Sequence, residues 1–572
     1  MVLPRVKEEK YLPGYIHFPK KVRVFDPSDG AEKFIEALRI IFPEREFVPS
    51  DAGTALIRRE TLPAGRSEEY GLSVGEDGDV IIIRSSDHPG AVHAAAVLRQ
   101  LAESERVPRR GIRDLPDNRV RSVMIDMPGG DVTSDELKAF VLRAALARYS
   151  QVHLHLLDAG GLAYLSEVYP QIPHLRGAQY TLAQLKELRD FCETLGLKLV
   201  GSLEFPNHAP VLLKVFPELA CDCRDGKRSA VDWSVCLNND AVFKVMKDLI
   251  LELDSVLPCE YVNIFGDEPA FPDHVPPMMS EWCHCERCSG LGKNDSERYQ
   301  AFARRVIEEI VRPMGKKLML DNDTIDVSRP VDLPKEDVVI SFWRIALPGR
   351  GPVEGCSMEK FLEQGFEVLN INYVDCYFDL PYGMTEESLS LWNPKQLAPP
   401  DSTAHKRISE QHPEKLSDIP FAVGEAARRI IGAEMNLWGC GTDLYRNHYS
   451  FTLPGGFYLF GDRMWNDAPL PMDENTRRAL SKAVLGEESE MFSVFGEALI
   501  PVPAVINDGQ ALVATLPLSL PNEDPAAYRE LIPQLERLIS APGLVSLDAK
   551  AYLRLIREAL KPENEKKPYP FK

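Results

Sequence analysis

The sequence predicts an α/β protein whose centre is a (β/α)8 barrel, preceded by a small α/β domain and followed by a helical region. After Arg119, apolar runs of strand length alternate with amphipathic stretches of helix length over roughly 350 residues, as expected for parallel strands joined by crossover helices. Polar residues follow these strand candidates at their C-terminal ends, where the active sites of closed barrels lie. We therefore expect domains at residues 1–117, 118–470 and 471–572.

Bulk composition fits a globular protein of this size. The chain has 572 residues, which is too long for one hydrophobic core, and 44% of them are hydrophobic. A formal net charge of −20 argues against nucleic acid and anionic membranes as partners. The N-terminus lacks the apolar core of a signal peptide, so we expect a cytoplasmic protein, although a secreted chain whose signal had been removed would look the same. The odd number of cysteines, 11, favours a reducing compartment over a disulfide framework.

The first domain shows helix and strand patterns but no chemical site. Asp87 lies where it could cap the second of its helices. The charged, Pro-containing run Val107–Asn118 is interpreted as a linker. Apolar spacing predicts strands at residues 21–25 and 79–84, and helices at residues 31–41 and 90–102.

The barrel and the C-terminal region follow from the same patterns. Strands are expected at residues 121–127, 151–157, 198–205, 261–265, 317–320, 338–343, 366–371 and 431–438. Helices are expected at residues 133–148 and 182–195, the second ended by Gly196, and beyond the barrel at residues 474–485, 524–538 and 548–560. The last three carry no chemistry and are expected to cover the barrel or to mediate a homodimer.

Two adjacent carboxylates, Asp267 and Glu268, follow the strand that starts at Tyr261. Neighbours on a strand point to opposite faces, so both can enter one cleft only where the backbone leaves the pleat, and Gly266 and Pro269 bracket such a break. Carboxylates held close together have separated pKa values, which suits one to hold a proton and the other a charge. The alternative is a helix N-terminus whose first-turn acids are stabilised by the helix dipole.

Several short motifs occur in the order found in one enzyme family. They are HLHLLDAGG (153–161), EFPNHA (204–209), FGDEP (265–269), YFD (377–379) and NLWG (436–439). With them, residues 119 to about 465 resemble the catalytic barrel of family 20 glycoside hydrolases, the β-N-acetylhexosaminidases, and the preceding domain resembles the N-terminal domain of that family. The resemblance covers more than half of the chain but is diffuse.

The resemblance implies an enzyme that removes a terminal N-acetylhexosamine with retention and uses the acetamide of the substrate as nucleophile. Glu268 would be the general acid and base, and Asp267 would orient the acetamide and balance the positive charge of the intermediate. Asp158 and His208 match a pair behind the acid that tunes its proton affinity. The alternative for His208 is a core histidine bonded to the backbone.

The resemblance also implies a substrate pocket. Its residues would be Trp343 and Trp438 as walls of the acetamide site, Tyr377 as a hydroxyl donor, and Asp379 and Asp126 as further polar contacts. The tryptophans could instead be plain barrel core.

Two positions depart from the family pattern. An arginine that grips the sugar hydroxyls is replaced by Gly129, and a glutamate that binds the same end of the sugar is replaced by Cys440. Candidate replacements are Arg344, Asp379 and Asp443. The sugar end of the pocket is therefore expected to be rebuilt for a modified or internal sugar.

A cysteine cluster follows the catalytic strand. Cys283, Cys285 and Cys288 could hold a structural zinc ion, with a fourth ligand from Cys223 or from Cys221, His274 or His284. The alternative is a loop of reduced cysteines. No cofactor is expected for catalysis, because a closed cysteine site leaves no open coordination position and so disfavours a zinc hydrolase.

The leading interpretation is a substrate-assisted β-N-acetylhexosaminidase acting on a glycan or glycoconjugate. The rival interpretation is a catalytically weak carbohydrate-binding protein on the same barrel, which Gly129 and Cys440 favour and the retained Asp158, His208, Asp267 and Glu268 disfavour.

Overall fold

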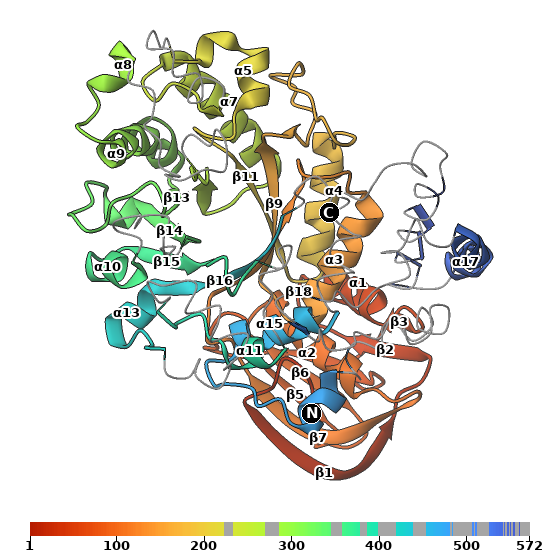
Figure 1. Cartoon of the computed structure of the whole chain (residues 1–572). Helices are drawn as coiled ribbons and strands as arrows, with labels where there is room; N and C mark the ends of the chain where they lie inside the picture. Colours follow the sequence, from red (N-terminus) through yellow and green to blue (C-terminus); the bar gives the residue numbers. More distant parts are fainter. Residues whose placement is uncertain are drawn as a thin grey trace.

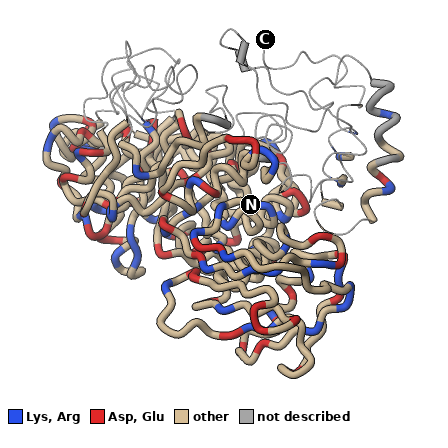
Figure 2. The backbone as a smooth tube through the Cα atoms, turned by 90° about the horizontal axis from the view of Figure 1, so that it is seen from below, with Lys and Arg blue, Asp and Glu red and all other residues tan. Residues whose placement is uncertain are grey.

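The protein is described by a computed structural model. It covers residues 1–221, 233–268, 285–344, 357–377, 386–397, 419–438 and 454–480, with shorter stretches between 483 and 560. An N-terminal α/β domain lies against one side of a barrel (Figure 1). In the view of Figure 2, basic and acidic residues are interspersed along both parts. Among the described helices, none combines the length and apolarity that crossing a membrane requires.

The N-terminal domain is built on a seven-stranded mixed sheet with the order β1-β7-β5-β6-β4-β2-β3. Its strands are β1 (Glu8–His17), β2 (Lys21–Phe25), β3 (Glu46–Pro49), β4 (Ile57–Thr61), β5 (Tyr70–Val74), β6 (Ile81–Ser85) and β7 (Arg106–Asp114). Helices α1 (Ala31–Ile41) and α2 (His88–Leu101) match the two predicted ones. Asp87 caps α2 as predicted, because its carboxylate accepts the backbone N–H of Gly90 at 2.9 Å.

The interpretation of Val107–Asn118 as a linker was wrong, since most of this run lies in β7, which pairs antiparallel with β1 and β5. Val107 and Ile112 point into the core, whereas Arg113 points to solvent and pairs with Glu69 at 2.8 Å. A strand with one solvated face carries alternating charges. That alternation gave the run the composition of a linker.

The barrel is closed by eight parallel strands, as predicted. They are β8 (Val120–Asp126), β9 (Gln151–Asp158), β11 (Lys198–Leu203), β12 (Tyr261–Asn263), β13 (Lys317–Asp321), β14 (Val338–Phe342), β15 (Glu367–Asn370) and β16 (Ile430–Leu437). Closure occurs because β8 pairs with both β9 and β16. At that seam Gly432 has a φ of +146°, and a Cβ there would lie 1.8 Å from the carbonyl oxygen of Val120. Only glycine allows the two strands to approach this closely.

Helices surround the barrel (Figure 1). The longer ones are α3 (Ser134–Leu146), α4 (Leu182–Thr194), α7 (Asp240–Val256), α9 (Asp295–Val306) and α15 (Pro454–Trp465). The shorter ones are α5 (Pro210–Val215), α8 (Glu286–Ser289), α10 (Met358–Glu363), α11 (Glu386–Leu391) and α13 (Gly424–Arg429). Gly196 ends the segment after α4 with a φ of +72°, as its predicted position requires.

The C-terminal region contains α17 (Pro525–Leu538), which confirms one of its predicted helices, and residues 474–480 are also helical. Two short strands, β17 (Ile506–Asn507) and β18 (Gln510–Ala511), pair antiparallel. The described C-terminal stretches are therefore mainly helical, unlike the N-terminal domain with its seven-stranded sheet.

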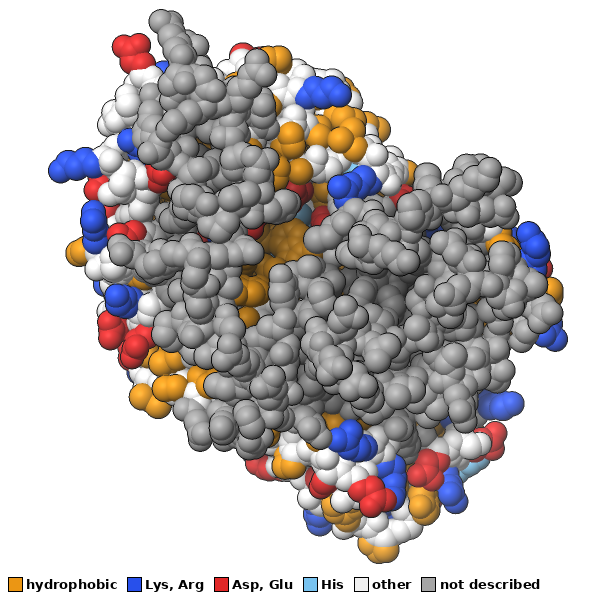
Figure 3. All heavy atoms as spheres, in the orientation of Figure 1, with side chains coloured by type: hydrophobic (Ala, Val, Ile, Leu, Met, Phe, Trp, Pro, Cys, Tyr) orange, Lys and Arg blue, Asp and Glu red, His pale blue; other side chains and the backbone are white. Residues whose placement is uncertain are grey.

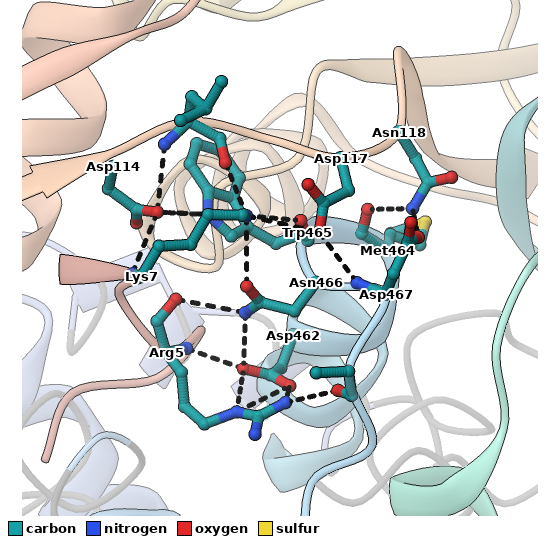
Figure 4. Close-up of polar contacts among 12 residues, drawn as sticks. Arg5, Lys7, Asp114, Asp117, Asn118, Asp462, Met464, Trp465, Asn466 and Asp467 are labelled. Atoms are coloured by element: carbon teal, nitrogen blue, oxygen red, sulfur yellow. Dashed lines mark hydrogen bonds and ion pairs between the residues drawn. The ribbon is translucent and has the colours of Figure 1, made fainter.

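Buried charges join the N-terminal domain to the barrel and to α15. The indole of Trp465 donates to Asp114 at 3.1 Å, and Arg5 pairs with Asp462 at 2.9 Å (Figure 4). Arg148, at the end of α3, is buried and pairs with Asp114 as well. Since a buried charge is costly unless it is paired, these contacts bind the two parts in one arrangement.

Candidate active site

The adjacent carboxylates lie where the backbone leaves β12. Residues 264–268 are irregular, and φ is +52° at Phe265, +81° at Gly266 and +48° at Glu268. A Cβ on Gly266 would lie 2.0 Å from the hydroxyl oxygen of Tyr299, so this position needs glycine. The predicted break in the pleat is therefore present. No helix begins within residues 264–268, and Pro269 lies outside the described residues.

Three side chains form hydrogen bonds with the backbone of Asp267 and Glu268. The amide of Asn207 donates to the carbonyl of Asp267 at 2.6 Å, and the indole of Trp233 donates to the carbonyl of Glu268 at 2.9 Å. The backbone N–H of Glu268 donates to Asp323 at 3.1 Å. Positive φ values in non-glycine residues cost of order 1–3 kcal/mol and persist only where such contacts fix them.

His208 faces both carboxylates. Its Nδ1 lies 3.2 Å from Asp158, while its Nε2 lies 3.9 Å from Asp267 and 3.7 Å from Glu268. His155 contacts the other oxygen of Asp158 at 2.9 Å. The predicted set of Asp158, His208, Asp267 and Glu268 is therefore brought together in one place.

Electrostatics separate the protonation of these groups. Burial opposes the charge of His208, but Asp158 and Asp267 outweigh it and raise the pKa of His208 to about 10. Burial also acts to raise the pKa of Asp158, yet His208 and His155 hold it well below its usual range. Burial raises the pKa of Asp267 to about 6, and burial together with the Asp267 charge raises the pKa of Glu268 to about 7. Near neutral pH, Glu268 can therefore hold a proton after Asp267 has lost its own.

Two deeper carboxyls lie below this pair. Burial, followed by the charge of Asp267, raises the pKa of both Glu204 and Asp321 well above their usual values. Glu204 also accepts the backbone N–H of Gly266 at 2.9 Å. Burial therefore disfavours a further negative charge at these two positions.

Arg344 lies beside the acid. Its guanidinium is 3.7 Å from Glu268 and 3.1 Å from Asp323, which also accepts the indole N–H of Trp343 at 3.3 Å. The sequence offers Arg344 as a replacement for the missing arginine at the remote end of the sugar. In the structure its guanidinium lies against Glu268, and its charge lowers the pKa of Glu268.

Aromatic rings gather next to the carboxylates. Trp343 and Tyr377 are stacked with centroids 6.4 Å apart, and Tyr377 lies 6.2 Å from Trp438. Trp343 is also 7% exposed and packs with apolar side chains of the barrel interior, so it belongs to the core as well as to the aromatic group. In Figure 3, hydrophobic side chains form the floor of a central hollow with acidic and histidine side chains beside them. Asp379 lies outside the described residues.

Asp126 ends β8 and stabilises the turn that follows it. Asp126 is only 6% exposed, and its carboxylate accepts the backbone N–H of Gly129 at 2.9 Å. The carbonyl of Gly129 accepts a hydrogen bond from Arg176 at 3.1 Å. An arginine from another loop thus reaches the position where the motif lacks one. Cys440 and Asp443 lie outside the described residues.

Four cysteines lie together beyond these groups. Cys285 and Cys288 are together, as their spacing predicts, and the candidate Cys221 joins them. The fourth is Cys236, which no sequence motif indicates. Cys283 and Cys223 lie outside the described residues, as do His274 and His284.

Comparison with known proteins gives matches over the barrel. Residues 119–453 match the family model described as glycosyl hydrolase family 20, catalytic domain. A β-hexosaminidase of Vibrio furnissii is 24% identical over 334 residues, which cover 52% of each chain. A β-hexosaminidase of Akkermansia muciniphila is 26% identical over 354 residues, which cover 57% of this chain and 67% of that one. The first of these matches thus spans about half of its relative's length.

A solved structure shares the fold. The β-N-acetylhexosaminidase of Bacteroides fragilis superimposes with a TM-score of 0.66 at 19% identity and covers 85% of this chain and 96% of that one. At this identity the likeness concerns the fold alone.

Proposed function

Because the chain belongs to glycosyl hydrolase family 20, we propose that it is a retaining β-N-acetylhexosaminidase acting on a terminal N-acetylhexosamine. The observation that carries this proposal is the placement of Asp267 and Glu268 against His208, with a pKa of about 6 for the first and about 7 for the second. An aspartate that ionises before its neighbouring glutamate suits one group to balance charge and the other to deliver a proton.

In the first step, Glu268 protonates the glycosidic oxygen while the acetamide carbonyl oxygen of the substrate attacks the anomeric carbon. The bond to the leaving group breaks, and an oxazolinium-type ring forms. Asp267, as a carboxylate, accepts the acetamide N–H and offsets the positive charge that develops on this ring. The rings of Trp343, Tyr377 and Trp438 form an apolar wall suited to the acetamide methyl group.

In the second step, Glu268 takes a proton from a water molecule, which attacks the anomeric carbon from the side the leaving group left. The ring opens, the acetamide is restored, and the configuration is retained. His208, held by Asp158, keeps a positive charge near both carboxylates throughout. That charge prevents the pKa values of the pair from rising further.

The glycan is proposed to carry a substituent or a further sugar at its remote end. The motif position that would supply an arginine holds Gly129, whose carbonyl accepts Arg176. A guanidinium delivered from another loop has a different reach and direction. The pocket would therefore recognise a different arrangement of hydroxyl or charged groups.

The test is Glu268→Gln, assayed on N-acetylhexosaminides with poor and with good leaving groups. We expect kcat to fall by at least about 10²-fold for the poor leaving group. The cleavage step should slow less for the good leaving group, because only the poor one needs a proton to depart. The exposed Glu425→Gln on α13 is the matched control and should keep full activity. Full activity of Glu268→Gln on a natural glycoside would refute the assignment.

A further inference from the structure

We propose that Cys221, Cys236, Cys285 and Cys288 bind one structural zinc ion. The four sulfur atoms all lie within 4.8 Å of one another, and all four side chains are buried. They come from three separate segments, after the short turn Pro217–Leu219, before α7, and around α8.

The distances between sulfurs match a tetrahedron around one ion. With zinc–sulfur bonds of about 2.3 Å, tetrahedral geometry places the sulfurs about 3.8 Å apart. The Cys221–Cys288 separation is 3.7 Å, Cys236–Cys285 is 3.9 Å and Cys236–Cys288 is 3.4 Å. Disulfide sulfurs would be about 2.0 Å apart, so these are not oxidised pairs. A polynuclear iron–sulfur cluster needs space for its own sulfides and irons between the cysteines, which this spacing does not leave.

Local structure supports a preformed site. Cys285 precedes α8, and its carbonyl accepts the N–H groups of Cys288 and Ser289 at 3.0 and 2.9 Å, which is the tight turn of a Cys-x-x-Cys knuckle. The N–H of Cys236 donates to Leu219 at 2.8 Å, and Asn238 donates to the carbonyl of Arg287 at 2.8 Å. The loops that carry the sulfurs are thus already bonded to one another. Four thiolate ligands fill the coordination shell, so the ion would be structural.

Such an ion would act on the acid through one short segment. Cys236 is three residues after Trp233, whose indole holds the carbonyl of Glu268 and whose ring lies 4.5 Å from His208. Between them, Ser234 donates to Asn207 at 2.8 Å, and Asn207 holds the carbonyl of Asp267. Zinc would anchor one end of this segment and so position Glu268, without touching the substrate.

The experiment measures metal content and thermal stability of the full chain, purified without chelator from cells supplied with zinc. Wild type is compared with Cys236→Ser and Cys288→Ser, and with Cys192→Ser, a buried cysteine on α4 outside the cluster. We expect about one zinc per chain in wild type and in Cys192→Ser, and less than about a tenth of that in the two cluster variants. The Tm of wild type should fall on chelation and recover on addition of zinc.

Cobalt replacement keeps the proposal testable if the cluster variants fail to fold. Protein grown with cobalt should show the intense thiolate-to-metal absorption of a tetrahedral four-sulfur site. Wild type free of zinc, with a Tm that zinc does not change, would overturn the proposal. So would iron in place of zinc, or zinc that stays in both cysteine variants and is lost from Glu268→Gln, since that ion would lie among His208, Asp267 and Glu268.

Discussion

Replacing His208 by asparagine should shift the pH dependence of the reaction toward alkaline pH. The Nε2 atom of His208 lies 3.9 Å from Asp267 and 3.7 Å from Glu268, and its charge lowers the pKa of both. At an effective dielectric constant of 20, a unit charge at about 3.8 Å is worth about 4 kcal/mol, or about three pKa units. Solvent reaches part of these side chains, so this is an upper limit and we expect a rise of one to three units.

The sign of the effect follows for each limb of the profile. Wild-type kcat/KM should fall below about pH 6, where Asp267 takes up a proton, and above about pH 7, where Glu268 loses one. In His208→Asn both limbs move up. With a rise of only one unit, the ionised fraction of Asp267 at pH 6 falls from about one half to about one tenth, so kcat/KM falls at least about fivefold.

The assay is kcat/KM against pH on one aryl N-acetylhexosaminide. His155→Asn is the matched control, because His155 pairs with Asp158 and, among the described residues, makes no ion pair with Asp267 or Glu268. Its limbs should stay near those of wild type. If both limbs of His208→Asn stay within about 0.3 unit of wild type, the charge of His208 does not set these pKa values.

Two further predictions concern the domain interface and the sugar. The carboxylate of Glu68 pairs with Arg121 and His93. Burial acts to raise the pKa of Glu68, but these two partners lower it from 4.5 to about 2. Glu68→Gln should therefore lower the free energy of unfolding by about 3 kcal/mol above pH 4.5. The loss, measured by denaturant unfolding, should shrink as pH falls toward 2, whereas Glu60→Gln in an exposed pair should change little. For the sugar, thiazoline compounds that bind the acetamide pocket should inhibit the enzyme. Plain aryl N-acetylglucosaminides should be poorer substrates than those decorated at the 3-, 4- or 6-position, because a substrate that leaves part of the pocket unfilled has a lower kcat as well as a lower affinity. Equal turnover of plain and decorated substrates would show that Gly129 does not alter recognition.

The barrel could be predicted because its strands are buried on both faces. Strands such as β14 and β16 are buried along their whole length and therefore appear as continuous apolar runs. In the N-terminal sheet, β1 and β7 have solvated faces, and their charges masked their apolar positions. Half-buried strands resemble linkers in composition, so only their pairing reveals them.

The candidate site could be predicted where its residues belong to strand ends. Asp158, His208, Asp267 and Glu268 are in motifs attached to barrel strands, and the structure brings all four together. Trp233 and Cys236 could not be found in this way. They lie in a segment between elements, and their partners are distant in the chain. Spacing along the sequence carries no record of contacts of this kind.

The position of the acid depends on these distant partners more than on its own strand. β12 ends at Asn263, and Glu268 follows it in a left-handed backbone conformation that a glutamate does not favour. The backbone N–H of Glu268 donates to Asp323, which follows β13, and its carbonyl accepts from Trp233, which follows β11. Removing either contact would let the strained peptide relax, at a gain of order 1–3 kcal/mol, and turn the carboxyl away from the leaving group. Glu268 is therefore oriented by the loops after β11 and β13. If it is the proton donor that we propose, a stabilising site in the first of these loops, beside Cys236, would matter for catalysis while lying outside the pocket.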